Sequence, residues 1–237
     1  MFKGSFPAPL FYYVGAPCAI SSLVLIYYIS QYLHHDAPFP HRTISQVAQH
    51  YPEFLIFRMS TVTGSVLIAL GWMTNYFFLK TVCKESGINL SSYHALAPLT
   101  AGVSAGCLLM GSTAAIDTGH MNGTFHGICA TSFFILTFFA QIYNTVVVAL
   151  LSQKTKLISV CNLYVKYGIL ILLALQFIYS AEGGFDLEDI VSLGDDKSNF
   201  LEWTMTVTII GMFLSIGADV SGYEFVYVED RGEQIDA

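Results

Sequence analysis

The chain has 237 residues, of which 54% are hydrophobic and 11% are charged, against about 25% charged residues in an average soluble domain. The formal net charge of −7 comes without the basic cluster that typifies nucleic-acid-binding proteins. The apolar residues lie in runs of about 20, the length at which a helix crosses the hydrocarbon core of a bilayer. Composition therefore predicts an integral membrane protein and argues against a nucleic-acid partner.

Six apolar runs, separated by polar links, predict six transmembrane helices in a single membrane domain. None shows the period-two alternation of a membrane β-strand. The first run is too long for the core of a cleaved signal peptide, so we expect it to remain as a helix. The predicted fold class is an all-α six-helix bundle. Its helices cover residues 10–33, 54–79, 96–116, 125–151, 157–181 and 201–220, with an acidic tail at 221–237.

The distribution of Lys and Arg predicts that both termini are cytosolic. Six spans put the termini, the link after the second helix and the link after the fourth on one side, together with seven of the ten Lys and Arg residues. An excess of Lys and Arg marks the cytosolic side. The opposite, luminal side then carries six of the seven histidines and most of the acidic residues. We therefore expect any chemistry at the luminal side.

Two patterns resemble catalytic or metal-binding motifs but have simpler explanations. Residues 102–106 match the G-x-S-x-G nucleophile pattern, yet they fall inside a predicted helix and not at a strand-to-helix turn. Gly102 and Gly106 also have the spacing of small residues that pack membrane helices closely. No luminal histidine pair has the i, i+4 spacing of a helical zinc motif. We expect a structural role for the two glycines, and neither a metal nor a cofactor.

Charged and titratable side chains occur at the membrane edge of three predicted helices. Arg58 lies near the start of the second helix, His126 begins the fourth, and Glu202 and Asp219 open and close the sixth. Such side chains are costly against lipid, so they should face the interior and have partners. Two interpretations stay open. Either these residues pair and hold the bundle together, with Asp219 structural, or they line a cavity that binds a polar lipid headgroup.

Under the second interpretation each residue has a chemical role. The guanidinium of Arg58 suits a lipid phosphate because it offers paired hydrogen-bond donors. An imidazole exchanges protons near neutral pH, so His126 suits proton transfer, with Glu202 as its partner. These two are the candidate catalytic residues.

The loop into the second helix, residues 39–53, is the most patterned connection in the chain. Pro52 suits a helix start, where its missing N–H is harmless. Glu53 is favourable at the positive end of the helix dipole and is expected to orient Arg58. A structural role for Pro52 is therefore part of the prediction.

Three blocks of residues follow one another in order over nearly the whole chain. They are Ile44-Ser45, Ala48, Pro52-Glu53 and Phe57-Arg58; His126, Ala130, Phe133 and Phe134; and Glu202-Trp203, Asp219 and Phe225. Together these blocks resemble the Frag/DRAM/Sfk family of six-helix membrane proteins. The resemblance is closest to its post-GPI-attachment-to-proteins factor 2 branch and to the related Cwh N-terminal domain.

The resemblance implies a protein of the Golgi or endoplasmic reticulum that acts in lipid remodelling of glycosylphosphatidylinositol (GPI) anchors. In that process a lyso-GPI is reacylated, either by the chain itself or with a separate remodelling enzyme. The partner would be a membrane lipid of the GPI or phosphoinositide type. Its headgroup would meet a set of luminal residues: Ser45, Glu53, Arg58 and Asp117.

Two departures from the GPI branch leave sibling branches open. Residues 59–65 lack the His and Pro-Arg of that branch, and Phe57 stands where a Trp is expected. The alternative is a non-enzymatic membrane protein of the DRAM or Sfk type. Such a protein would act in autophagy at the lysosome or organise a phosphoinositide kinase at the plasma membrane.

Overall fold

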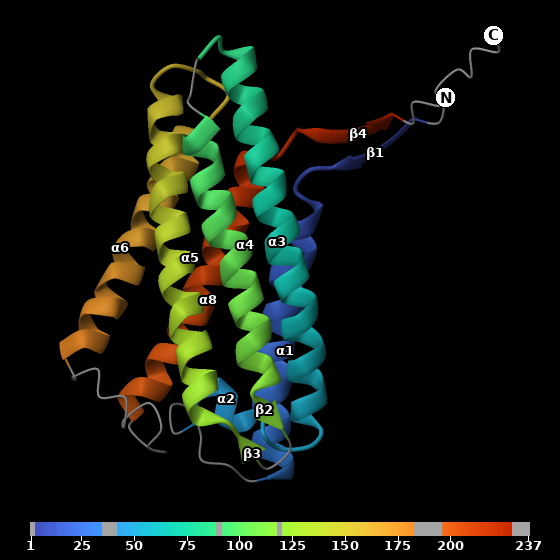
Figure 1. The fold of residues 1–237 in the computed structure, drawn as a ribbon, viewed down its shortest axis with the longest axis vertical. Helices are drawn as coiled ribbons and strands as arrows, with labels where there is room; N and C mark the ends of the chain where they lie inside the picture. Colours follow the sequence, from blue (N-terminus) through green and yellow to red (C-terminus); the bar gives the residue numbers. More distant parts are fainter. Residues whose placement is uncertain (1–2, 35–41, 89–91, 118–119, 183–195, 229–237) are drawn as a thin grey trace.

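Six long helices run side by side in one bundle (Figure 1). The computed structural model describes residues 3–34, 42–88, 92–117, 120–182 and 196–228. Each long helix is apolar and long enough to cross a membrane. The shortest have 23 residues and rise about 34 Å, against a hydrocarbon core of about 30 Å. The helices are α1 (Leu10–Leu33), α3 (Glu53–Glu85), α4 (Ser92–Ala114), α5 (Gly123–Ser152), α6 (Val160–Glu182) and α8 (Asp196–Asp219).

The predicted six-helix membrane bundle is confirmed. Two predicted helices were too long at one end, since α4 ends at Ala114 and not at 116, and α6 begins at Val160 and not at 157. Other helices extend past their expected ends for a simple reason. Hydropathy detects only the part of a helix that lies in hydrocarbon, whereas the backbone stays helical into the polar region. Thus α3 continues past residue 79 to Glu85, because Lys80, Lys84 and Glu85 are good helix formers. In the same way α8 begins at Asp196, before the predicted start at 201.

The outward-facing surface of the bundle is apolar. Large hydrophobic side chains stand exposed on all the long helices, among them Val24, Val62, Met110, Phe139, Ile171 and Val207. A soluble monomer rarely exposes such a continuous apolar surface. In a bilayer the same side chains face lipid tails, so exposure carries no penalty.

One single-turn helix, α2 (Ile44–Val47), was not predicted. It is stabilised by a capping box, in which Thr43 Oγ1 accepts from the Gln46 N–H and Gln46 Oε1 accepts from the Thr43 N–H, both at 3.0 Å. Figure 1 shows α2 among the lower ends of the long helices, at the end of the bundle opposite the two termini. We call these the α2 end and the terminus end.

Two short antiparallel ribbons were also not predicted. At the terminus end, β1 (Lys3–Pro7) pairs with β4 (Glu224–Val228), so part of the expected acidic tail is a strand. Residues 229–237 of that tail lie outside the described residues. At the α2 end, β2 (Ile116–Asp117) pairs with β3 (His120–Met121) between α4 and α5. The β1–β4 pairing holds both ends of the described chain at one end of the bundle, as an even number of spans requires.

Close packing of α4 on α3 depends on the two glycines singled out in the sequence. A Cβ at Gly102 would lie 2.2 Å from the indole of Trp72, and a Cβ at Gly106 would lie 3.0 Å from the Ser65 carbonyl oxygen. Trp72 is buried, with 1% of its surface exposed. The indole therefore occupies the space that a side chain at Gly102 would need.

We expect Gly102→Ala to destabilise the protein by about 1–3 kcal/mol, because overpacking a filled interface forces side chains from their rotamers. Gly64→Ala is the matched control, since a Cβ at Gly64 meets nothing within 4 Å and Ala favours a helix over Gly. Thermal unfolding of the purified variants in one detergent measures both. Equal melting temperatures for Gly102→Ala and Gly64→Ala would contradict this account of the α3–α4 contact.

A buried ion pair joins α6 to α8 near the terminus end. Lys166 Nζ lies 3.0 Å from Asp219 Oδ2, and both side chains are wholly buried. Lys166 also donates to Ser215 Oγ at 3.0 Å, and the Asn162 amide donates to Asp219. Asp219, expected to be structural, thus has a cationic partner on the neighbouring helix.

Lys166→Met should destabilise the protein strongly, because it leaves the Asp219 carboxylate buried without its cation. Breaking one side of a buried pair typically costs about 3–5 kcal/mol. The double variant Lys166→Met/Asp219→Leu should regain much of that loss, because no charge remains unpaired. Lys154→Met, on the exposed link between α5 and α6, is the control for removing one Lys. A double variant no more stable than Lys166→Met alone would refute the pairing.

Candidate functional site

The candidate site is centred on the hydroxyl of Ser45. Ser45 Oγ lies 2.8 Å from His126 Nε2 and 2.8 Å from Glu202 Oε1. The Ser45 backbone N–H also donates to Glu202 Oε1 at 3.2 Å. His126 and Glu202 are 81 and 157 positions from Ser45 along the chain. One short helix turn thus joins residues from three distant parts of the sequence.

The hydrogen-bond partners of Nδ1 determine the tautomer of the His126 ring. Nδ1 lies 3.0 Å from the carbonyl oxygen of Ser112 and 3.0 Å from its hydroxyl oxygen. A carbonyl oxygen only accepts hydrogen bonds, so Nδ1 carries the hydrogen that it donates. In the neutral imidazole Nε2 is then an acceptor 2.8 Å from Ser45 Oγ. The single hydrogen of the Ser45 hydroxyl, which is donated to Glu202 Oε1, can also be directed at this nitrogen. The backbone of α4 thereby sets both the tautomer and the orientation of the ring.

Local structure holds each of these side chains in position. α2 carries Ser45, which is 5% exposed. His126, 9% exposed, lies in the first turn of α5, whose N-cap residue Asn122 accepts from the Phe125 N–H. The Trp203 indole of α8 donates to the Arg42 carbonyl oxygen at 2.9 Å. That bond ties the segment before α2 to the helix that carries Glu202.

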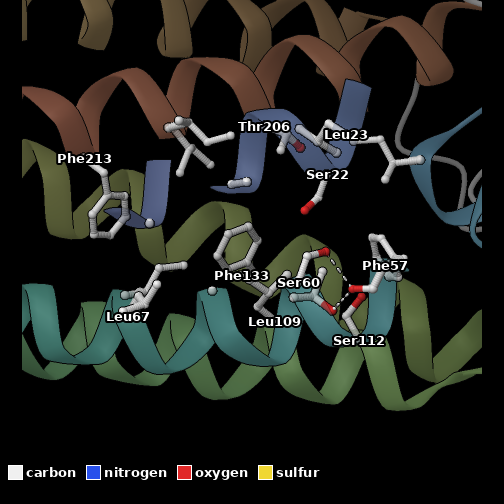
Figure 2. A pocket seen from close by; sticks show the side chains of 18 of the residues that line it. Ser22, Leu23, Phe57, Ser60, Leu67, Leu109, Ser112, Phe133, Thr206 and Phe213 are labelled. Atoms are coloured by element: carbon white, nitrogen blue, oxygen red, sulfur yellow. Dashed lines mark hydrogen bonds between the residues drawn. The ribbon is translucent and has the colours of Figure 1, made fainter. Parts of the chain in front are cut away.

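An apolar cavity of about 160 Å³ runs from this cluster into the bundle between α1, α3, α4, α5 and α8. Its lining on α8 extends from Glu202 to Phe213, roughly 16 Å at 1.5 Å per residue. Figure 2 shows Phe213 and Leu67 toward one end, and Ser60, Phe57 and Ser112 toward the other. Half of a hydrocarbon core of about 30 Å is about 15 Å. The cavity therefore has the length of one leaflet.

Most hydroxyl groups along the cavity wall are satisfied by their own helices. Ser60 Oγ and Thr61 Oγ1 both donate to the Phe57 carbonyl oxygen, at 3.0 and 2.7 Å (Figure 2). Ser22 Oγ donates to the Cys18 carbonyl oxygen, and Thr206 Oγ1 donates to that of Glu202. The polar groups that remain to interact with a ligand lie at the α2 end of the cavity, around Ser45.

The cavity adjoins the outer surface of the bundle between α1 and α3. A groove of about 320 Å³ on that surface shares lining residues with the cavity, including Ala19, Ser60 and Gly64. Its outer wall includes Met59 and Thr63, which are exposed. This groove, which we call the opening, therefore faces the region that lipid tails occupy in a bilayer.

The other predicted headgroup residues lie at the same end of the bundle but outside the cavity lining. Glu53 is buried and its Oε1 lies 3.2 Å from His34 Nε2. Arg58 Nη2 donates to the Ile116 carbonyl oxygen at 2.8 Å, and the guanidinium stacks over the Phe54 ring. Asp117 is exposed on β2. The structure therefore joins Ser45, His126 and Glu202, and gives Glu53 and Arg58 separate partners.

Pro52 is the N-cap residue of α3, one position before Glu53. It thus occupies the helix start that the sequence indicates, and Glu53 lies in the first turn, as the helix dipole favours.

Sequence reasoning missed two parts of the site. Ser112 contributes mainly a backbone carbonyl group, which every residue has, so its sequence carries no signal. The lining from α1 consists of ordinary apolar residues such as Leu23 and Ile26. The Thr43–Gln46 capping box was the one available signal for α2. Among the described residues no group of three or more His, Cys, Asp or Glu side chains is arranged to hold a metal ion.

The fold and the site define a class of protein: an integral membrane bundle whose helices enclose an apolar cavity with a buried serine, histidine and glutamate at one end. The chain belongs to the Frag1/DRAM/Sfk1/Cwh43P N-terminal domain family, whose model matches residues 7–223. The match is to the family as a whole and not to one of its branches. No curated protein sequence and no solved structure matches the chain.

We expect Ser45→Ala to lower the stability of the protein by about 1–3 kcal/mol, because His126 Nε2 and Glu202 Oε1 each lose a partner in a buried place. Ser22→Ala is the matched control, since its hydroxyl bonds only within α1. Thermal unfolding of the purified proteins in one detergent compares them. A Ser45→Ala protein as stable as Ser22→Ala would mean that the cluster contributes nothing to the fold.

Proposed function

We propose that this protein binds a membrane lipid, with an acyl chain in the cavity and the polar end of that chain at Ser45, His126 and Glu202. The observation that carries the proposal is the polarity of the cavity, which is apolar along its length and polar at one end. This matches the chemical asymmetry of a lipid chain. The cavity length of roughly one leaflet and the opening between α1 and α3 support the same reading.

Physical chemistry explains why the polar end matters most. A lipid tail already lies in hydrocarbon, so transfer from the bilayer into an apolar cavity gains little hydrophobic free energy. Packing in the cavity and hydrogen bonds at its end must therefore provide the affinity. Hydrogen bonds in a dry site are stronger than in water, and the buried Ser45 hydroxyl and His126 imidazole are suitably situated for an ester or a hydroxyl group.

We further propose that the lipid is of the GPI type and that the chain acts in fatty-acid remodelling of GPI anchors, in the Golgi or endoplasmic reticulum. The motif spacing around Ser45, Glu53 and Arg58 supports this assignment, as does membership of the family. Under this proposal a phosphoinositol headgroup projects from the cavity toward Glu53, Arg58 and Asp117, at the luminal side.

Gly64→Leu provides a direct test, because Gly64 lines both the cavity and its opening and a Cβ there meets nothing within 4 Å. The leucine should fill the opening without disturbing the fold and should reduce co-purifying lipid several-fold. Gly168→Leu is the control: Gly168 also has open space around it, but it lies on α6 outside the cavity lining. Mass spectrometry of lipids extracted from equal amounts of folded protein measures the difference.

The same two variants test the GPI assignment in cells that lack the chain. Gly168→Leu should restore the fatty-acid composition of GPI-anchored proteins at the cell surface, and Gly64→Leu should not. Normal anchors in the cells lacking the chain would overturn the assignment. Equal rescue by both variants would favour the non-enzymatic DRAM or Sfk type of function, which does not require the cavity.

A further inference from the structure

We propose that Ser45 is a catalytic nucleophile that carries the acyl group as a covalent ester, with His126 as its general base. The inference rests on the proposed function, because it requires a lipid chain in the cavity. It assigns acyl transfer to this chain itself and identifies the atom to which the acyl group is attached. It also makes the donor a lipid ester that is already present in the membrane.

The geometry of Ser45 and His126 is that of an activated hydroxyl. A weak nucleophile needs a base within about 2.6–3.2 Å and a third group that orients the base. Ser45 Oγ and His126 Nε2 lie 2.8 Å apart, and the Ser112 carbonyl oxygen holds Nδ1 at 3.0 Å. Here a backbone carbonyl plays the orienting part that an aspartate plays in serine hydrolases.

Glu202 has a different role, because its carboxylate is hydrogen-bonded to Ser45, whereas the His126 ring lies between Ser45 and Ser112. Oε1 accepts from the Ser45 hydroxyl at 2.8 Å and from the Ser45 N–H at 3.2 Å. The carboxylate therefore fixes the position of Ser45. A hydroxyl has one hydrogen, so in the attacking geometry it turns from Glu202 to His126 Nε2, which also lies 2.8 Å from Oγ. When His126 takes up a proton, the nearby negative charge of Glu202 also favours the imidazolium that forms.

The position of Ser45 makes it reactive toward a lipid and not toward a soluble ester. It lies at the polar end of an apolar cavity whose opening faces the bilayer. A tail that fills the cavity brings its carboxyl carbon, the last atom of the chain, to that end. By contrast Ser104, the serine of the G-x-S-x-G match, is exposed on α4 and does not line the cavity.

The transfer requires only Ser45, His126, a glycerolipid ester as the acyl donor and a lysolipid as the acceptor. In the first half, Ser45 Oγ bonds to the carbonyl carbon of a glycerolipid ester, and the hydroxyl proton passes to His126 Nε2. The bond from that carbon to the glycerol oxygen then breaks, and this oxygen takes the proton from His126. In the second half, the hydroxyl group of a lysolipid attacks the Ser45 ester, and its proton returns through His126 to Ser45 Oγ. One ester is broken and one is formed, with no change in oxidation state.

The test uses the purified full chain in detergent and an alkyl fluorophosphonate with a long alkyl chain, which phosphonylates activated serines. Wild-type protein should be labelled at Ser45, as located by peptide mass spectrometry. Ser45→Ala should remove that label. His126→Gln should slow labelling by about 10²-fold or more, the usual contribution of a general base. Ser104→Ala should be labelled at Ser45 at the wild-type rate.

A second variant guards against a loss of folding. Ser45→Cys keeps a nucleophile at the same position and should form an acyl thioester, detected as an added acyl mass that neutral hydroxylamine removes. Labelling of wild-type protein that persists in Ser45→Ala would overturn the proposal. The proposal would also be overturned if wild-type protein co-purified with lipid but gave neither the label nor an acyl adduct. In that case the proposed lipid binding would still hold. Wild-type protein without bound lipid would instead refute the proposed function.

Discussion

The constraint on which this structure depends is that a polar group in the membrane must find its partner inside the bundle. Each helix satisfies its own backbone, so only side chains need partners from elsewhere. Two clusters of described residues meet this need, namely Lys166 with Asp219 at the terminus end and Ser45 with His126 and Glu202 at the α2 end. The first cluster is a closed ion pair. The second adjoins a cavity, and this difference separates a structural cluster from a candidate site.

The six spans were predictable because hydropathy and length together determine which segments cross a bilayer. His126 and Glu202 could also be predicted from the sequence as candidate site residues. Titratable side chains at helix ends are energetically unfavourable against lipid and therefore face the interior of the bundle. Contacts between helices were not predictable in this way. Nothing in the sequence indicates that the Ser112 carbonyl group would orient His126. Nor does it indicate that a single turn at Ile44–Val47 would bring Ser45 between His126 and Glu202.

The charge of Arg58 predicted a ligand-binding role, although this residue does not line the cavity. A guanidinium at a membrane edge suggests a phosphate ligand, and its expected partner was Glu53. In the structure Arg58 connects α3 to β2 through the Ile116 carbonyl oxygen, and Glu53 pairs with His34. A guanidinium has five N–H donors, so one bond to a carbonyl does not exhaust it. Arg58 thus keeps donors for a headgroup beside its structural bond, although it lies outside the cavity lining.

The location of Ser45 also bears on the choice between transfer and hydrolysis. An ester on Ser45 would be reached from the bilayer through the opening between α1 and α3, where a lysolipid can diffuse. Little water contacts Ser45, because this residue is 5% exposed, and α2 is held in place by its capping box and by the Trp203–Arg42 hydrogen bond of the preceding segment. Excluding water protects a reactive intermediate from hydrolysis. The same arrangement that buries Ser45 therefore favours a lipid hydroxyl over water as the acceptor.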